Sequence, residues 1–189
     1  MNDTGPDPSP WFRIRAASPE DALAVDTVRT AGWRHAYRGV VPDAVLDGMT
    51  PDPPRRRRQL ADPGPGGFDY LAESGGRVIG WVSAGPVRDS DLSTAVQEVY
   101  ACYVHPDQWG HGVGAALLTT ALGTLTGRPG VPEVVLWVLE GNGRARRFYE
   151  RHGFTPDGTR RLLPPGRVPG DVAEVRYVHA TRAPHHGDV

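Results

Sequence analysis

The distribution of apolar and polar residues predicts a run of alternating helices and strands. Residues 12–17, FRIRAA, alternate between the two classes, which is typical of a strand. Residues 18–39 predict a helix, because Ser18 can cap its first turn, Pro19 stands at the first helical position and a glycine ends it. Residues 42–49 predict a short second helix.

The middle of the chain predicts a hairpin and a third strand. Residues 69–74 and 77–87 are strand-like and flank a Gly-Gly pair, which is typical of a β-hairpin. Residues 97–105, QEVYACYVH, predict a further strand. The connection before the hairpin, residues 51–67, is polar and broken by prolines, so we expect no more than one helical turn there.

The last third of the chain predicts two helices and three strands. The helix expected over residues 112–126 has a broad apolar face, and residues 133–139, EVVLWVL, are apolar on both faces, as in a central strand. A second helix is expected over residues 142–153, followed by strands over residues 154–163 and 173–180. The resulting order, βααβββαβαββ, indicates an α/β (α+β) fold with a mixed sheet.

Length and composition indicate one ordinary globular domain. A chain of 189 residues can bury one core, which we expect over residues 11–182, with loose tails at residues 1–10 and 183–189. The longest apolar run is six residues, VVLWVL, and the N-terminus has no basic region followed by an apolar one. With a single cysteine as well, we expect a cytoplasmic protein without membrane contact.

Charge gives no support for nucleic acid as a partner. The formal net charge is −1, and all 21 basic residues are arginine. Four of them form a run at residues 55–58 beside prolines, which we interpret as a solvated helix face.

The segment HPDQWGHGVGAALL, residues 105–118, predicts a phosphate-binding loop. Its closely spaced glycines follow a strand and precede a helix, so backbone N–H groups and the helix dipole can both face an anion. A nucleotide P-loop needs a lysine, which this chain lacks. GHGVGA formally matches a dinucleotide fingerprint, but about 80 residues then remain for repeated βαβ units, so an NAD-binding oxidoreductase is a remote alternative.

The same loop resembles the acyl-CoA loop of the GNAT superfamily of N-acetyltransferases. In that family a strand ending in V-x-P continues as R/Q-x-x-G-x-G/A into a helix. Val104, Pro106, Gly112 and Gly114 match this pattern. Trp109 departs from it, because arginine or glutamine is usual at its position.

A later segment, NGRARRFYERHGF, resembles a second motif of the family, N-x-x-A-x-x-F/L-Y-x-x-x-G-F, about 30 residues further on. The matching residues are Asn142, Ala145, Phe148, Tyr149, Gly153 and Phe154. The two motifs and the order of elements cover about residues 12–180. The resemblance implies the GNAT fold, a central mixed and mostly antiparallel sheet of six or seven strands with helices on both faces.

The resemblance also implies acetyl-CoA as the acyl donor, without a metal ion. The backbone of Cys102 and Val104 would pair with the pantetheine arm, Asn142 would contact that arm, and N–H groups of residues 110–115 would hold the pyrophosphate. An N–H near Val104 would polarise the thioester carbonyl. The expected cofactor-binding residues are Cys102, Tyr103, Val104, Trp109, Gly110, His111, Gly112, Val113, Gly114, Ala115, Asn142, Ala145 and Tyr149.

The implied reaction is direct acetyl transfer from a thioester to an amine. An amine with a pKa of ~10.4 is neutral in only about one molecule in 10³ at neutral pH, whereas a thiolate with a pKa of ~8.5 leaves readily, so a base matters more than an acid. Glu98 is the candidate base, acting through a water, and its alternative role is that of an exposed acid at a strand edge or of an ion-paired one. Tyr149 is the candidate acid, and core packing is its alternative. A covalent role for Cys102 is disfavoured, because a lone strand cysteine usually packs.

The acceptor is less defined. The segment WRHAYRGVVPDAVL, residues 33–46, lies where family members build the acceptor side of the cleft. Trp33 and Tyr37 are the candidate acceptor-site residues, and packing inside the helix is equally open for both. We expect a primary amine of a small molecule or peptide, and a homodimer is compatible with the family. A non-catalytic acyl-CoA-binding domain with a sensing or regulatory role remains the alternative function.

Overall fold

The computed structural model describes residues 11–163, 168 and 171–181. Within these residues the strands are β1 Arg13–Ala16, β2 Phe68–Ser74, β3 Arg77–Pro86, β4 Gln97–Val104, β5 Glu133–Leu139, β6 Thr155–Leu162 and β7 Ala173–Ala180. The helices are α1 Ala22–Ala36, α2 Asp43–Gly48, α3 Pro53–Ala61, α4 Val113–Thr126 and α5 Gly143–Arg151, with 3₁₀ turns at Pro19–Asp21 and Pro106–Gln108. The tails expected at residues 1–10 and 183–189 lie outside the described residues.

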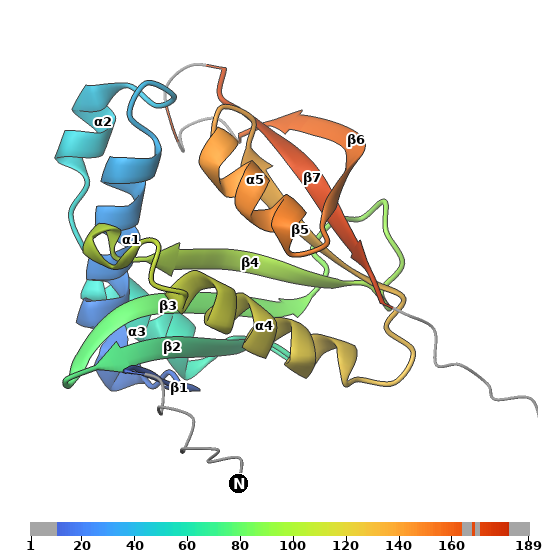
Figure 1. The fold of residues 1–189 in the computed structure, drawn as a ribbon, viewed down its shortest axis with the longest axis horizontal. Coiled ribbons are helices and arrows are strands. Elements are labelled where there is room, and N and C mark those ends of the chain that lie inside the picture. Colours follow the sequence, from blue (N-terminus) through green and yellow to red (C-terminus); the bar gives the residue numbers. More distant parts are fainter. Residues whose placement is uncertain (1–10, 164–167, 169–170, 182–189) are drawn as a thin grey trace, which may run out of the picture.

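All these strands join one seven-stranded sheet in the order β1-β2-β3-β4-β5-β7-β6 (Figure 1). The β4–β5 pair is parallel, and every other pair of neighbouring strands in the sheet is antiparallel. The predicted mixed, mostly antiparallel sheet is therefore confirmed, and so is the central place of β5. A dinucleotide-binding fold would need repeated parallel βαβ units, and the described strands form only one parallel pair in this sheet.

The structure adds one helix to the predicted order, which becomes βαααβββαβαββ. The expectation of no more than one helical turn in the proline-rich connection was wrong, because this segment forms α3. Pro53 occupies the first helical position, and the Asp52 side chain accepts a hydrogen bond from a backbone N–H of the first turn. Both are helix-start signals, so the prolines begin this helix rather than prevent it.

One arginine of the run at residues 55–58 anchors α3 to the rest of the molecule. The Arg56 guanidinium lies 3.0 Å from Asp26 Oδ1 on α1 and 4.4 Å from the centroid of the Trp81 ring on β3. Its side chain is 11% exposed, so the interpretation of the whole run as a solvated face was wrong for Arg56. A guanidinium can be buried in this way because one partner satisfies its charge and the other covers its flat face.

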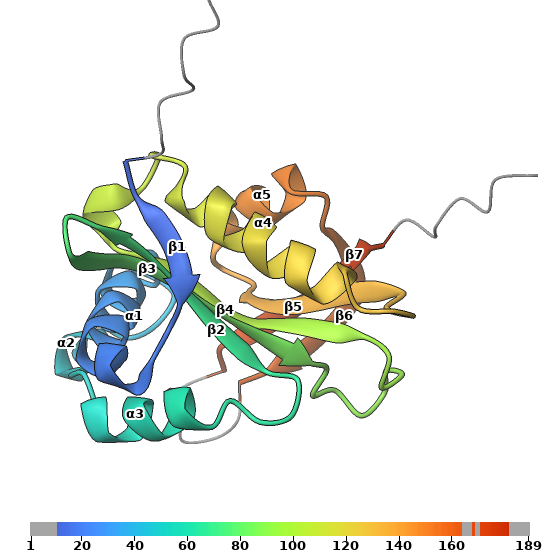
Figure 2. The same cartoon turned by 90° about the horizontal axis from the view of Figure 1, so that it is seen from below.

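Helices cover both faces of the sheet, as predicted (Figure 2). α4 and α5 pack on one face around a core that includes Leu117, Leu136 and Tyr177. α1 and α3 pack on the other face, where Val25 and Leu60 contact the sheet. None of the helices in the described part of the chain has the length and apolar character that a membrane crossing needs.

The sheet opens at its centre. β4 and β5 pair only from Gln97 to Val99, opposite Val134–Leu136. Beyond that point β4 continues along β3 and β5 continues along β7, so the two parallel strands move apart (Figure 1). The gap that results is bounded by α1 on one face of the sheet and by α4 and α5 on the other.

Candidate active site

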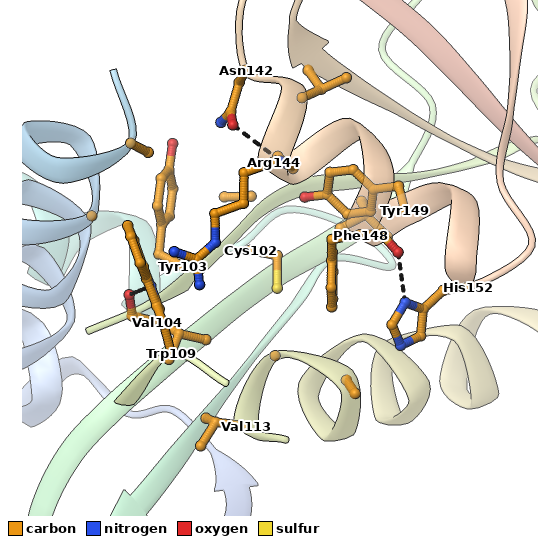
Figure 3. Close-up of a pocket in the computed structure, with 18 of the residues that line it drawn as sticks. Cys102, Tyr103, Val104, Trp109, Val113, Asn142, Arg144, Phe148, Tyr149 and His152 are labelled. Carbon is orange, nitrogen blue, oxygen red and sulfur yellow. Dashed lines mark hydrogen bonds between the residues drawn. The ribbon is translucent and has the colours of Figure 1, made fainter. Parts of the chain in front are cut away.

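A pocket of about 410 Å³ occupies the gap between β4 and β5 (Figure 3). Most of the residues predicted for the site line it. They are Tyr37, Cys102, Tyr103, Val104, Trp109, Gly110, Gly112, Val113, Gly114, Ala115, Asn142, Ala145 and Tyr149. Glu98, His111 and Trp33 are not among the lining residues. The two sequence motifs thus meet at one cavity, although they are separate in the chain.

The glycine loop forms one end of the pocket wall. Gly110 and Gly112 have φ angles of 84° and 79°, in the left-handed region that favours glycine. Gly112 is also the N-cap of α4, and the first N–H groups of a helix have no partner inside the helix. Gly114 lies in the first turn of α4, close to β4 and α5, since a Cβ there would lie 3.5 Å from both Val104 and Phe148. Such a loop can hold an anion through its backbone.

The exposed edge of β4 forms the floor of the gap. The His105 N–H bonds Ile79 on β3, so strand alternation directs the backbone groups of Val104 and Cys102 toward the gap. The Trp109 indole N–H donates to the Val104 carbonyl at 2.9 Å (Figure 3). One acceptor of the free edge is therefore already covered by a side chain of the loop.

Asn142 and Tyr149 come from α5, on the other wall. The Asn142 side chain accepts a hydrogen bond from the Ala145 N–H at 3.0 Å and so caps the first turn of α5. Tyr149 is 8% exposed and lines the pocket near Cys102 (Figure 3). Burial raises the pKa of the Tyr149 hydroxyl well above its usual value, with smaller contributions from Cys102 and Tyr103. The hydroxyl therefore stays protonated at neutral pH and can act as a donor.

Aromatic side chains of α1, β4 and β5 form another part of the pocket wall, which we call the aromatic end. The Trp33 indole N–H donates to the Tyr103 hydroxyl at 2.7 Å, and the Trp33 and Tyr37 rings meet edge to face at 4.7 Å. Burial raises the pKa of the Tyr37 hydroxyl well above its usual value, and the charge of Tyr103 and a hydrogen bond with it add to the shift. Of the two residues predicted for the acceptor, Tyr37 lines the pocket, whereas Trp33 packs behind it and holds Tyr103.

The structure places Glu98 in an ion pair. Its side chain is 1% exposed, and its carboxylate accepts hydrogen bonds from the Arg88 backbone N–H at 3.0 Å and from the Arg88 guanidinium through Nε at 3.1 Å and through Nη2. The guanidinium also lies 4.1 Å from the centroid of the Tyr100 ring, which lines the pocket. The alternative role considered for Glu98, an ion pair, is therefore present, and its role as a base remains a prediction.

One aromatic residue of the pocket wall was not singled out from the sequence. Trp137 on β5 lines the pocket, and its indole N–H donates to Asp89 at 2.8 Å. The Arg161 guanidinium carbon lies 3.7 Å from the centroid of the Trp137 ring, and Arg161 and Arg176 both pair with Asp89. These residues come from the β3–β4 loop and three strands, so no short motif contains them.

The arginines of α5 were also missed. The family motif includes Ala145 and Phe148, but it gives no sign that Arg144 and Arg151 line the pocket as well. Arg144 reaches across the gap, and its guanidinium carbon lies 3.7 Å from the centroid of the Trp109 ring (Figure 3).

Known proteins resemble this chain in sequence. The model of the Acetyltransferase (GNAT) family matches residues 33–154. A probable N-acetyltransferase of Mycobacterium tuberculosis is 34% identical over 156 residues, which are 78% of this chain and 82% of that protein. A mycothiol acetyltransferase of Geodermatophilus obscurus is 34% identical over 153 residues, which are 80% of this chain and 49% of that protein. The chain thus spans about half the length of the mycothiol acetyltransferase.

A solved structure resembles it in fold. The crystal structure of PaiA N-acetyltransferase from Thermoplasma acidophilum in complex with coenzyme A aligns with a TM-score of 0.70 and 17% sequence identity. The alignment covers 90% of this chain and 99% of that one. The overall fold therefore recurs in a protein that shares only 17% sequence identity with this chain.

Proposed function

Since this chain belongs to the Acetyltransferase (GNAT) family, we propose that it moves an acetyl group from acetyl-CoA directly to a primary amine of a small molecule or peptide. One observation carries the proposal. Two parallel strands part after three paired residues, and the pocket between them joins a glycine loop to a buried tyrosine hydroxyl. This arrangement offers separate places for a phosphate group, an extended amide chain and a reacting sulfur.

The residues present suit acyl-CoA. N–H groups of the glycine loop would hold the pyrophosphate, because Gly110 and Gly112 let the backbone approach without side chains. The edge of β4 at Cys102 and Val104 would pair with the amides of the pantetheine arm as an added strand does. Asn142 and Ala145 would contact that arm from α5. Acetyl-CoA supplies an activated thioester carbonyl to this site.

The chemistry then needs a proton donor and a proton acceptor. As the amine nitrogen bonds to the carbonyl carbon, the carbon–sulfur bond breaks and the sulfur gains a proton. Tyr149 would supply that proton, because its hydroxyl is protonated and lines the pocket. An N–H near Val104 would stabilise the negative charge that develops on the carbonyl oxygen.

Glu98 would accept the proton of the amine through a water. Burial and the ion pair hold its carboxylate in one position on the strand that borders the gap. The same ion pair occupies its oxygens, so a water reaches the carboxylate only by replacing one bond from Arg88. Replacing Glu98 with glutamine tests this role directly.

The proposal is tested by measuring release of free CoA thiol from acetyl-CoA in the presence of a panel of primary amines, including amino acids, polyamines, amino sugars and short peptides. We expect one thiol per acetylated amine, with the product identified by mass. Saturable binding of acetyl-CoA without turnover on any amine would instead support a non-catalytic binding domain. A chain that binds no acetyl-CoA would contradict both functions.

A further inference from the structure

The side chain of Trp109 is hydrogen-bonded to the protein backbone. It stands where the loop pattern usually has arginine or glutamine, yet its indole N–H donates to the Val104 carbonyl at 2.9 Å. The ring therefore lies along the edge of β4, at the start of the glycine loop. Trp109 cannot supply the positive charge that an arginine would bring there.

A guanidinium reaches the same place from the opposite wall. Arg144 lies in the first turn of α5, and its side chain extends across the gap to Trp109 (Figure 3). Its guanidinium carbon is 3.7 Å from the centroid of the indole ring, and both residues line the pocket. Gly110, the next residue after Trp109 and the first glycine of the loop, lines the same pocket.

Within the part of the chain that the structure describes, Arg144 has no carboxylate partner. Its neighbour on α5, Arg146, instead donates to the Tyr177 hydroxyl at 3.0 Å and to the Glu140 carbonyl. The first turn of α5 contains no acidic residue, and a cation there opposes the helix dipole. Arg144 is thus exposed in the pocket wall without a carboxylate partner, so its guanidinium can bind an anion.

Stacking leaves the hydrogen-bonding edge of this guanidinium free. A guanidinium contacts an aromatic ring through its flat face, whereas its N–H groups lie in the plane and point away from the ring. Those in-plane groups match the oxygens of a phosphate in pairs. Trp109 can therefore hold the cation in place without using the donors that a phosphate needs.

We propose that Arg144 replaces, from α5, the arginine that the loop lacks, and that it binds a phosphate of acyl-CoA while Trp109 serves as its platform. This inference rests on the proposed use of acetyl-CoA. It assigns to Arg144 a role in cofactor binding, and to Trp109 the role of a positioning residue.

The experiment compares Arg144→Ala with Arg147→Ala. Arg147 is exposed on the same helix and does not line the pocket, so it controls for the loss of one positive charge. Each variant is titrated with acetyl-CoA and with acetyl-pantetheine, which has no phosphate groups. We expect Arg144→Ala to weaken acetyl-CoA about tenfold and to leave acetyl-pantetheine unchanged. Arg147→Ala should change neither affinity, and all variants should keep the melting temperature of the native protein.

A swap provides the second measurement. Adding Trp109→Arg to Arg144→Ala returns a guanidinium to the loop, and we expect acetyl-CoA affinity within threefold of the native protein (about 0.7 kcal/mol). Equal weakening of both ligands by Arg144→Ala would overturn the inference, since it would show a wall residue rather than a phosphate partner. Equal behaviour of Arg144→Ala and Arg147→Ala, or no recovery in the swap, would overturn it as well. A native protein that does not bind acetyl-CoA would refute the proposed function instead.

Discussion

The two ends of the pocket are made of different parts of the chain. At the loop end, residues 109, 110 and 112–115 line the pocket from one short segment, and positive φ angles at Gly110 and Gly112 keep that backbone accessible. At the aromatic end, Tyr37, Tyr103 and Trp137 supply side chains from α1, β4 and β5. The loop end is thus defined by conformation, whereas the aromatic end is defined by packing.

This difference determines which substitutions disrupt each end of the pocket. A backbone cradle tolerates changes in neighbouring side chains, as Trp109 indicates, but it is lost when the conformation changes or the space is filled. The aromatic end depends on pairs such as Trp33–Tyr103 and Trp137–Asp89, so single side chains there alter orientation and protonation while the backbone stays in place. Substitutions at the two ends should therefore separate cofactor binding from catalysis.

The largest effect is expected at the loop end, from Gly112→Glu. Glutamate brings a negative charge to the phosphate position and adopts φ 79° only at a cost of about 1–2 kcal/mol. We expect no measurable binding of acetyl-CoA by calorimetry. Gly130→Glu is the matched control, because Gly130 has φ 75°, open space around its Cα and a place outside the pocket. If Gly112→Glu and Gly130→Glu had similar affinities for acetyl-CoA, the loop would not be the phosphate-binding site.

The same contrast explains what the sequence could predict. The loop end follows from contiguous patterns, since glycine spacing and the Asn142 cap encode backbone geometry locally. The aromatic end depends on residues far apart in the chain, such as Trp33 and Tyr103, which are 70 positions apart, or Asp89 and Arg176, which are 87 apart. The Asp89–Arg176 contact depends on β7 lying next to β5, and the Trp33–Tyr103 contact depends on α1 packing near β4, neither of which local patterns specify.

Two further misses have the same cause. The Glu98 partner, Arg88, comes from a loop ten residues earlier, and nothing in the strand pattern indicates its direction. Arg144 lies within the second motif, but its stacking on Trp109 depends on the gap between β4 and β5, which no single segment of the sequence shows. By contrast, the elements with a strong apolar pattern, such as β5 and α4, were predicted to within one residue of their bounds.

The next largest effect tests the proton acceptor near the aromatic end, by Glu98→Gln. If the carboxylate takes the proton of the amine, kcat/KM for an alkyl amine should fall about 10²-fold at pH 7, with acetyl-CoA affinity unchanged. An amine with a pKa of ~10.4 becomes neutral as the pH rises, so the variant should approach the native rate toward pH 10. Rates are measured from pH 6 to 10, with Glu133→Gln as control. If kcat/KM of Glu98→Gln stayed close to that of the native protein at every pH, Glu98 would serve only in the ion pair with Arg88.

A smaller effect is expected from Tyr149→Phe, at the junction of the two ends. The leaving thiolate needs limited assistance because its pKa is ~8.5, so loss of the donor should lower kcat about tenfold. The KM for acetyl-CoA should change little, since the ring remains. Because the raised pKa keeps the hydroxyl protonated, the native kcat should show no loss attributable to this tyrosine up to pH 9. Tyr70→Phe, outside the pocket, serves as control. An unchanged kcat in Tyr149→Phe would show that Tyr149 is a packing residue and not the proton donor.

The smallest effect is expected from Cys102→Ala, although Cys102 lies in the middle of the pocket (Figure 3). Burial raises the pKa of its thiol to about 12, so at pH 8 only about one molecule in 10⁴ carries the reactive thiolate. A covalent acetyl-enzyme through this sulfur would therefore be slow, and direct transfer needs only the backbone of β4 at this position. We expect kcat to stay within about threefold of the native value. Mass spectrometry of the native protein after incubation with acetyl-CoA should show no added acetyl group, and a stable adduct lost in Cys102→Ala would replace direct transfer by a two-step reaction.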